Sequence, residues 1–481
     1  MNITFGTDGW RGIVGDDFTF ENVRYVAQGI AEYIIDRRGS SAVVGYDFRF
    51  GSEVFAQEAA RVLAGNKLRA LCLEHASPTQ VASWTIIAER AAGAMMITAS
   101  HNPYLFNGIK YRPETASSAP PEVLRELEKL INRIAAGGPS RVKIAAADDP
   151  LITSHDPRPS YFAQLGKMVD LPALRSSGLR VLHECMYGSG SGYLSQLLGG
   201  GATSVTELHP ERNPFFGGVH PEPLPQNMPL ALSQMASGDY DLAICTDGDA
   251  DRVGIIDERG EFVNQLEVYA LLMRYLVEMR GWRGPFVKSL NMTSMADRLA
   301  ERYQLPVHEV QVGFKNIAPK MAETEALLGG EESGGYAIRG HINERDGLLV
   351  GLFFADMIRR SGRPLSRLRS DLSELVGPHA YRRHDFDLPR EGYEEARQRV
   401  LTKLREHPPR ELAGVAVSRV RDDDGFKYTL ADGSWVLLRT SGTEPLVRVY
   451  SEAASMQEVE ARLQALEEVV DLARKPENAH I

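Results

Sequence analysis

A short apolar segment, a loop of glycine and polar residues, and then a helical pattern recur along this chain of 481 residues. Strands that alternate with helices predict an α/β architecture. In such folds ligands gather beyond the carboxyl ends of the strands, so the loops after the apolar segments are candidate sites of chemistry. The apolar segments are Ser41–Gly45, Ala91–Ile97, Leu179–Cys185, Tyr240–Cys245 and Pro285–Leu290, and helical patterns follow at 52–65, 193–198 and 295–303.

The length predicts several domains, because about 150 residues per domain gives about three for this chain. Two further helices are predicted from apolar residues at helical spacing, over 121–135 and 456–472. Ser455 and Glu458 resemble a capping box at the start of the second. The segments 148–159 and 376–389 contain several proline, glycine and aspartate residues and are candidate linkers.

Composition and charge exclude several classes of function. Lys and Arg number 54 against 64 Asp and Glu, a formal net charge of −10. This acidic balance disfavours nucleic acid and anionic membrane surfaces as partners. The three cysteines include no CxxC pair, which disfavours a disulfide framework or a structural zinc site. With no secretory signal pattern and no apolar run long enough to span a membrane, we expect a cytoplasmic protein.

Three carboxylates alternate with small residues in Asp247-Gly248-Asp249-Ala250-Asp251, followed by Arg252. A loop that curls can turn all three toward one point, and Mg²⁺ prefers such oxygen ligands. An EF-hand is excluded, because Arg252 stands where the sixth loop position requires glycine. The alternative is an acidic solvated turn, but the preceding apolar strand favours a magnesium site.

Ser100 and His101 follow another apolar segment, in Thr98-Ala99-Ser100-His101-Asn102-Pro103, and Lys110 comes ten residues after Ser100. A hydroxyl beside a histidine and a lysine can act as a nucleophile with acid and base partners. Taken alone, the pair is a weak signal, because a capped turn is the more common explanation of such a pair.

A third loop runs from Arg439 through Ser441, Gly442 and Thr443, and Arg448 lies beyond it. Hydroxyls, a glycine-freed backbone and guanidinium groups suit a phosphate dianion, although an ordinary turn with surface arginines has the same composition. Weaker signals are a glycine-rich loop with Arg11, a loop over 330–335 that suits sugar hydroxyls, and Lys315.

Taken together and in this order, the motifs GTDGWRG, TASHNP, DGDADR, GEESG and RTSGTEP resemble the α-D-phosphohexomutase family. That family includes phosphoglucomutase, phosphomannomutase and phosphoglucosamine mutase. The resemblance spans nearly the whole chain. It implies an isomerase that interconverts a hexose 1-phosphate and a hexose 6-phosphate through a phosphoserine enzyme, with a small phosphosugar as partner, Mg²⁺ as cofactor and glucose 1,6-bisphosphate as intermediate and activator.

The resemblance also implies residue roles. Ser100 matches the family's phosphoserine, and one of its phosphate oxygens completes the magnesium site of Asp247, Asp249 and Asp251. The other catalytic matches are His101 and Lys110 for proton transfer and Arg11 and Arg252 for stabilising the reacting phosphoryl group. The substrate-binding matches are Lys315, Glu331 and Ser333 on the sugar side, and Arg439, Ser441, Gly442, Thr443 and Arg448 around the phosphate that is not transferred.

The fold implied is four domains around a central cleft, three similar α/β domains and a smaller α+β C-terminal domain. We expect them at 1–147 with the phosphoserine loop, 148–255 with the metal loop, 256–375 with the sugar loop and 376–481 with the phosphate loop. The sequence leaves the oligomeric state open between monomer and dimer.

The hexose is the least constrained expectation. TDGWRG and GEESGG lean toward glucose phosphates, the ending SGTEPLVRVY is similar to phosphoglucosamine mutases, and Gly335 stands where a number of members carry histidine. We expect glucose, with mannose or glucosamine phosphate as alternatives. Two other classes remain open: a magnesium-dependent sugar phosphatase, and a binding protein that has kept the fold without catalysis.

Overall fold

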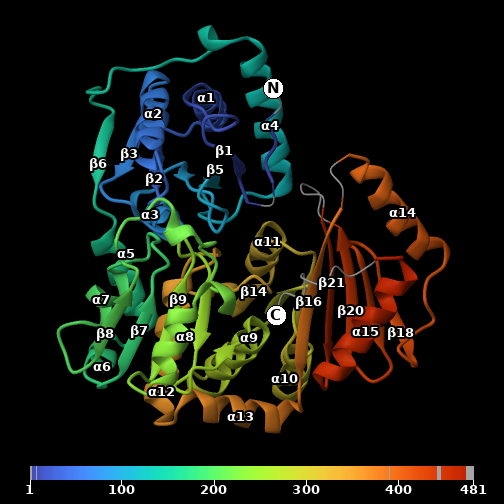
Figure 1. The fold of residues 1–481 in the computed structure, drawn as a ribbon. Helices are drawn as coiled ribbons and strands as arrows, with labels where there is room; N and C mark the ends of the chain where they lie inside the picture. The colour runs from blue at the N-terminus through green and yellow to red at the C-terminus, as the bar shows by residue number, and fades with distance from the viewer. Residues whose placement is uncertain (1–2, 7, 389–390, 441–445, 473–481) are drawn as a thin grey trace. The chain divides into compact units, whose positions relative to one another are not determined.

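The structure, a computed structural model, describes residues 3–6, 8–388, 391–440 and 446–472. By its internal contacts the chain divides into two compact units. The first consists of residues 1–287 and 313–368, and the second of residues 288–312 and 369–481 (Figure 1). Both units combine helices with sheets, and no helix among the described residues is long and apolar enough to cross a membrane.

The first unit begins with a six-stranded sheet in the order β1-β5-β4-β2-β3-β6. The strands are β1 (Trp10–Ile13), β2 (Ser41–Tyr46), β3 (Arg69–Leu73), β4 (Gly93–Ile97), β5 (Phe106–Pro113) and β6 (Ile152–His155). β4, β2, β3 and β6 are parallel, and β5 runs antiparallel to both β4 and β1. The segment 148–159, expected to be a linker, therefore contains a strand of this sheet.

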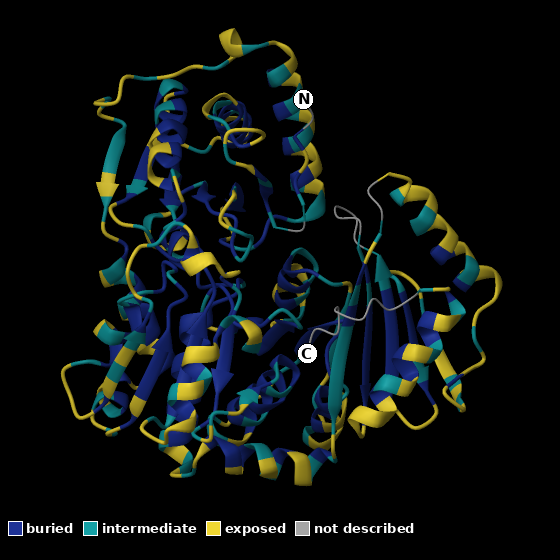
Figure 2. Cartoon of the chain, in the orientation of Figure 1, coloured by how far each residue is buried: buried dark blue, intermediate teal, exposed yellow. Residues whose placement is uncertain are grey.

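Helices cover both faces of this sheet because neighbouring residues of each buried strand point to opposite faces. Val44 packs into the core formed with α1 (Phe20–Asp36), α2 (Ser52–Gly65) and α4 (Pro121–Ala136). Val43 packs on the other face with α3 (Thr79–Glu89). The helices predicted over 52–65 and 121–135 are thus confirmed, the second ending one residue later. The strands between them are largely buried (Figure 2).

The second sheet of this unit has the order β11-β10-β9-β7-β8. Its strands are β7 (Arg180–Glu184), β8 (Ser204–Leu208), β9 (Leu242–Thr246), β10 (Val253–Ile256) and β11 (Phe262–Val263). α8 (Pro229–Ala236) packs on one face. α7 (Tyr193–Leu198) and α12 (Gly347–Ser361) pack on the other, where Gly351 lets α12 approach Ile244 of β9. Every residue of β9 is buried, so the aspartate loop follows a core strand.

The rest of the first unit includes a short hairpin, in which β14 (Leu328–Glu331) pairs antiparallel with β15 (Gly335–Ile338). Its other helices are α5 (Arg158–Met168), α6 (Leu171–Arg175), α9 (Gln265–Arg274) and α11 (Phe314–Thr324). Short helical turns are η1 (Pro139–Arg141), η2 (Phe216–Gly218), η3 (Pro225–Asn227) and η4 (Tyr275–Met279). β12 (Phe286–Ser289) and α13 (Leu365–Val376) run from one unit into the other.

The second unit contains an antiparallel sheet in the order β16-β21-β20-β19-β18-β17. The strands are β16 (Ala380–Asp387), β17 (Glu411–Leu412), β18 (Val415–Arg421), β19 (Phe426–Leu430), β20 (Trp435–Thr440) and β21 (Leu446–Ala453). α14 (Tyr393–Glu406) and α15 (Met456–Val469) share a core with one face. This unit also contains α10 (Met295–Tyr303) and β13 (Val307–Val310).

The predicted cap of α15 is present, because Ser455 Oγ accepts a hydrogen bond from the Glu458 backbone N–H at 3.3 Å. The Glu458 carboxylate accepts from the backbone N–H of Ala454 rather than from that of Ser455. The prediction that 376–389 is a linker was wrong in one respect, because this segment contains the eight residues of β16.

Candidate active site

Two loops that follow buried strands meet in the first unit. Ser100 comes three residues after the end of β4, and Asp247 comes directly after β9. The Ser100 hydroxyl donates a hydrogen bond to Asp247 Oδ2 at 2.9 Å, and both side chains are buried. The structure therefore brings together the hydroxyl and the acidic loop that the sequence singles out from positions 147 residues apart.

The close approach of the two loops depends on Gly248. A Cβ on this residue would lie 2.6 Å from the Ser100 carbonyl oxygen, which is closer than real contacts allow. The same carbonyl accepts a hydrogen bond from Arg49 Nη2 at 2.6 Å, and the Ser100 N–H donates to Thr98 Oγ1 at 2.9 Å. These contacts hold Ser100 at a φ of 53°, in the left-handed region that a non-glycine residue rarely adopts.

The three aspartates lie in a loop that turns back sharply, because β9 and β10 pair antiparallel with Thr246 opposite Val253. All three side chains are fully buried, and one oxygen from each lies within 4.8 Å of the others. Burial, together with the charges of Asp249 and Asp251, raises the pKa of Asp247 well above its usual value. Three buried carboxylates this close repel one another, and a cation would relieve that repulsion.

Two further observations indicate that these carboxylates suit a magnesium ion. Asp249 Oδ1 and Asp251 Oδ1 are buried and accept no hydrogen bond from any described residue. Buried carboxylate oxygens are rarely left without a partner, so each has a free lone pair for a ligand. The donor set consists only of oxygen, which is the preference of a hard cation such as Mg²⁺.

Lys110 projects from β5 into the same cluster. Its Nζ lies 2.7 Å from Asp249 Oδ2, 2.6 Å from Asp251 Oδ2 and 3.0 Å from Asp8 Oδ2. Burial favours the neutral amine, but the charges of these carboxylates outweigh it and raise the pKa of Lys110. The ammonium group is therefore positively charged at neutral pH and balances part of the acidic charge.

His101 lies beside the Ser100 hydroxyl, and the charges of two arginines act on its imidazole. His101 Nδ1 lies 3.4 Å from Ser100 Oγ. Burial, with the nearby charges of Arg252 and Arg11, lowers the pKa of His101 well below its usual value, so the imidazole is neutral and can accept a proton. Arg11 donates to the Asn102 side chain, and Arg252 Nη1 pairs with Glu222 at 2.6 Å.

Arg345 is a member of this cluster that the sequence analysis missed. It pairs with Asp8, with Asp251 Oδ2 at 2.8 Å and with Glu331 Oε1 at 3.1 Å. A Cβ on Gly335 would lie 2.2 Å from Arg345 Cδ, so the arginine stem occupies the space of a side chain at position 335. The available signal was a single arginine between two acids, Glu-Arg-Asp, shortly after a glycine-rich hairpin.

Thr79 is a second missed residue and lies at the start of α3. Its hydroxyl donates to Asp249 Oδ2 at 2.5 Å, and its backbone N–H donates to the Asp249 carbonyl at 3.1 Å. These two bonds fix Asp249 against α3, which packs on the first sheet. No local pattern marks Thr79, because a threonine near the start of a helix is common without any role beyond capping.

The predicted sugar-side residues occupy the hairpin and a nearby helix of the first unit. Glu331 ends β14, and Ser333 lies in the hairpin loop. The Ser333 hydroxyl is buried and has no hydrogen-bond partner in the described part of the chain. Lys315 lies in the first turn of α11 beside Phe314, whose ring centre is 5.4 Å from the Arg345 guanidinium carbon.

The predicted phosphate loop belongs to the second unit. Arg439 of β20 and Arg448 of β21 are directly opposite in the antiparallel pair. Arg439 Nη2 pairs with Asp424 at 2.9 Å, and Arg448 Nε lies 3.7 Å from Asp385 Oδ2. Ser441, Gly442 and Thr443 lie outside the described residues.

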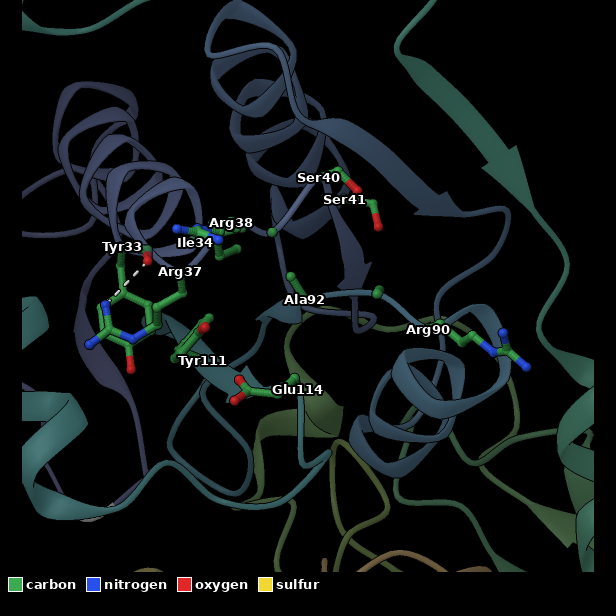
Figure 3. A pocket seen from close by; sticks show the side chains of 12 residues that line it. Tyr33, Ile34, Arg37, Arg38, Ser40, Ser41, Arg90, Ala92, Tyr111 and Glu114 are labelled. Carbon is green, nitrogen blue, oxygen red and sulfur yellow. Dashed lines mark hydrogen bonds between the residues drawn. The ribbon is translucent and has the colours of Figure 1, made fainter.

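A pocket of about 330 Å³ lies elsewhere in the first unit, between the end of α1 and β5 (Figure 3). The Arg37 guanidinium carbon lies 3.6 Å from the centre of the Tyr33 ring at one side, and Tyr111 and Glu114 are also part of the lining. None of the candidate residues described above lines this pocket. It is therefore distinct from the cluster around Ser100.

Comparison with known proteins identifies the family. Domain models of the phosphoglucomutase/phosphomannomutase family match residues 2–137 (domain I), 159–260 (domain II), 265–375 (domain III) and 396–469 (C-terminal domain). A probable phosphoglucosamine mutase of Methanothermobacter thermautotrophicus is 30% identical, with 93% of each chain covered. The chain belongs to the α-D-phosphohexomutase family.

Other similar proteins carry different names. A probable phosphoglucosamine mutase of Methanopyrus kandleri is 28% identical to this phosphohexomutase, with 99% of this chain and 98% of the relative covered. A phosphoglucomutase/phosphomannomutase of Thermococcus kodakarensis is 27% identical, with 96% and 97% covered. The crystal structure of a putative phosphomannomutase from Thermus thermophilus matches with a TM-score of 0.85 and 32% identity, covering 98% of this chain and 99% of that one.

The fold extends to more distant members. N-acetylphosphoglucosamine mutase from Aspergillus fumigatus, solved in complex with GlcNAc-6P and magnesium, is 14% identical with a TM-score of 0.59 over 98% of this chain and 96% of that one. These findings confirm the predicted family and the four-domain α/β architecture. The chain is a phosphohexomutase, an isomerase of the intramolecular phosphotransferase class. The names of its relatives divide between glucose, mannose and glucosamine phosphates.

Proposed function

We propose that this phosphohexomutase interconverts glucose 1-phosphate and glucose 6-phosphate through glucose 1,6-bisphosphate, with Ser100 as the phosphoryl carrier. The main support is the hydrogen bond of 2.9 Å between the Ser100 hydroxyl and Asp247, inside a buried cluster of carboxylates and cations. A hydroxyl in that position can carry a phosphoryl group beside a divalent cation. Phosphoryl transfer depends chiefly on such positioning and charge neutralisation.

Asp247, Asp249 and Asp251 would hold the magnesium ion together with an oxygen of phosphorylated Ser100. Bound there, Mg²⁺ neutralises negative charge on the transferring phosphoryl group. The chain's own cations add to this neutralisation. Lys110 already contacts Asp249 and Asp251, and we assign Arg11 and Arg252 to the equatorial oxygens of the phosphoryl group in transfer.

The reaction consists of two balanced half-reactions. The free sugar hydroxyl attacks phosphorus, its O–P bond forms as the Ser100 Oγ–P bond breaks, and the hydroxyl proton passes to a base. We assign His101 and Lys110 to the proton transfers, with His101 favoured by its neutral imidazole 3.4 Å from Ser100 Oγ. The bisphosphate then turns over, and its other phosphate returns to Ser100 by the reverse steps.

Substrate contacts are assigned on both ends of the sugar phosphate. Glu331 and Ser333 would bind sugar hydroxyls, and Lys315 would contact the phosphosugar. The Ser333 hydroxyl is suited to this role because no described residue hydrogen-bonds to it. The residues assigned to the phosphate that is not transferred are Arg439, Ser441, Gly442, Thr443 and Arg448. The register of β20 and β21, which sets the two arginines opposite each other, favours a guanidinium clamp.

Glucose is proposed over glucosamine from the charge around Glu331. Its carboxylate is already paired with Arg345 at 3.1 Å. A neutral hydroxyl can donate to this carboxylate without displacing the guanidinium, whereas the ammonium of an amino sugar would compete for the same charge. Glucosamine phosphate is the second candidate, because two relatives that match over at least 93% of this chain are named probable phosphoglucosamine mutases.

We also propose the domain boundaries near 147, 255 and 375. The family's domain models, which end at 137, 260 and 375, support this division. β6 joins the sheet of the first domain from beyond 147, so an isolated first domain should include residues to about 156.

The test of the carrier uses purified full-length protein with Mg²⁺ and a trace of glucose 1,6-bisphosphate. We expect isomerisation, a phosphopeptide that contains Ser100, and loss of both in Ser100→Ala. Ser176→Ala, which removes an exposed hydroxyl elsewhere in the first unit, is the matched control and should retain activity. Full activity in Ser100→Ala contradicts the proposal, and net release of inorganic phosphate instead of isomerisation indicates the phosphatase alternative.

The hexose is tested by comparing kcat/KM for the 1-phosphates of glucose, mannose and glucosamine with the same enzyme preparation. We expect the highest value for glucose 1-phosphate. A higher value for glucosamine 1-phosphate would overturn the assignment of the hexose while leaving the role of Ser100 intact.

A further inference from the structure

Three side chains that commonly bind transition metals lie together on the second sheet of the first unit, next to Thr246, which directly precedes the aspartate loop. His183 in β7 and Cys185 just after it are two residues apart, so they point to the same face. Glu207 in β8 is the direct parallel partner of His183. One donor atom from each residue lies within 4.8 Å of the other two, and no described step of the mutase reaction uses them.

The spacing of the donor atoms suits a tetrahedral ion. His183 Nδ1 is 3.4 Å from Glu207 Oε1 and 3.4 Å from Cys185 Sγ. For tetrahedral Zn²⁺ with bonds of ~2.0 Å to nitrogen and oxygen and ~2.3 Å to sulfur, neighbouring donors are separated by ~3.3 Å (N to O) and ~3.5 Å (N to S). These two separations therefore match such an ion, and the third, between the Cys185 and Glu207 donor atoms, is within 4.8 Å.

Surrounding contacts orient the donors. His183 Nε2 lies 3.2 Å from Thr246 Oγ1, so an Nε2–H can donate to that hydroxyl and leave the Nδ1 lone pair facing the other two donors. The Gly192 N–H donates to Glu207 Oε1 at 2.9 Å and fixes the carboxylate. His183 and Cys185 are fully buried, whereas the Glu207 side chain is 15% exposed and offers a path for an ion from solvent.

We propose that His183 Nδ1, Cys185 Sγ and the Glu207 carboxylate bind one divalent transition-metal ion of the zinc type, with solvent as the remaining ligand. Binding replaces the S–H bond of Cys185 with a sulfur–metal bond and releases one proton to solvent. The nitrogen and sulfur donors favour a softer ion than the oxygen-only aspartate loop does. This site therefore prefers Zn²⁺-type ions, whereas the aspartate loop prefers Mg²⁺. None of the three side chains has a role in the proposed mutase mechanism.

The experiment titrates Co²⁺, a spectroscopic substitute for Zn²⁺, into the full-length protein in saturating Mg²⁺, which keeps the aspartate loop filled. We expect one equivalent to produce the near-ultraviolet charge-transfer band of a cobalt–thiolate bond, and one equivalent of Zn²⁺ to abolish it. The band is lost in Cys185→Ser and binding weakens at least about tenfold in Glu207→Gln. Cys72→Ser, which alters a half-buried thiol in the first sheet, is the matched control and retains the band.

A wild-type protein without the band overturns the proposal, as does a band that survives Cys185→Ser. Mutase activity and the thermal melting temperature, measured in Mg²⁺, show whether each variant is folded. If Cys185→Ser does not fold, the nearly isosteric Glu207→Gln decides the matter. Unchanged Co²⁺ affinity in that variant means that the three side chains are only a hydrogen-bonded part of the core.

Discussion

Replacing Gly248 with alanine tests whether the close approach of two loops forms the active site. The new Cβ would lie 2.6 Å from the Ser100 carbonyl oxygen, about 0.8 Å short of ordinary contact. Backbone on both sides must move apart by about that distance, which breaks the 2.9 Å hydrogen bond between Ser100 and Asp247. Because a displacement of about 1 Å can reduce a rate about 100-fold, we expect kcat/KM to fall by about two orders of magnitude.

The same substitution should cost only about 1–3 kcal/mol of unfolding free energy, the usual penalty for overpacking. Gly166→Ala is the matched control, since its Cβ would meet only Leu171 Cδ1 at 3.5 Å and it lies exposed in α5. Alanine there should leave turnover unchanged and stabilise the helix by about 0.5–1 kcal/mol. Isomerisation kinetics and urea denaturation measure both effects. Turnover of Gly248→Ala within twofold of wild type would refute the reasoning.

Three other outcomes are expected. Removing divalent cations with EDTA abolishes isomerisation, and Mg²⁺ restores it. The reason is that Asp249 Oδ1 and Asp251 Oδ1 are buried without another partner among the described residues. Activity that persists after exhaustive chelation contradicts the proposed cofactor. Arg345→Ala leaves Asp8 and Asp251 without one of their buried cations. We expect urea denaturation to show an unfolding free energy lower by about 3–5 kcal/mol, with partial rescue by Arg345→Lys. A loss below about 1 kcal/mol would show that the ion pairs contribute little to stability. Burial raises the pKa of Cys72 to about 11, so its thiolate is scarce at neutral pH. The rate of its alkylation by iodoacetamide, followed by peptide mapping, should rise about tenfold per pH unit between about pH 7 and pH 10. A rate that reaches a plateau above about pH 9 would disprove this prediction.

The sequence predicted those parts of the fold in which local pattern and burial agree. The helix over 52–65 has apolar residues at helical spacing, and the structure ends it at the same residues. β6 was missed because its four residues, Ile-Thr-Ser-His, are only partly buried at the edge of the sheet and show no apolar alternation. An edge strand owes its position to its neighbour β3, and no local pattern records that pairing.

The same contrast between local pattern and long-range pairing explains which residues of the candidate site could be predicted. Ser100 and the aspartates could be found because each follows a buried apolar strand, and the ends of such strands are where ligands bind. Arg345 could not be found in that way, since its partners Asp8 and Glu331 are distant in sequence and the ion pairs exist only after folding. A charged residue near a turn is usually exposed to solvent, whereas Arg345 is buried.

Arg49 shows how a buried cation can determine where the Ser100 hydroxyl, the proposed phosphoryl carrier, lies. Its guanidinium is fully buried and donates to the carbonyl oxygens of Ser100 and Asn102 at 2.6 Å and of Pro103 and Phe106 at 3.0 Å. Burial lowers its pKa to about 10, so it still carries its charge at neutral pH. A planar fork can serve four carbonyls at once, which a lysine cannot do. The left-handed Ser100 backbone, unfavourable by itself, is thus held in place by the hydrogen bonds of a buried guanidinium group.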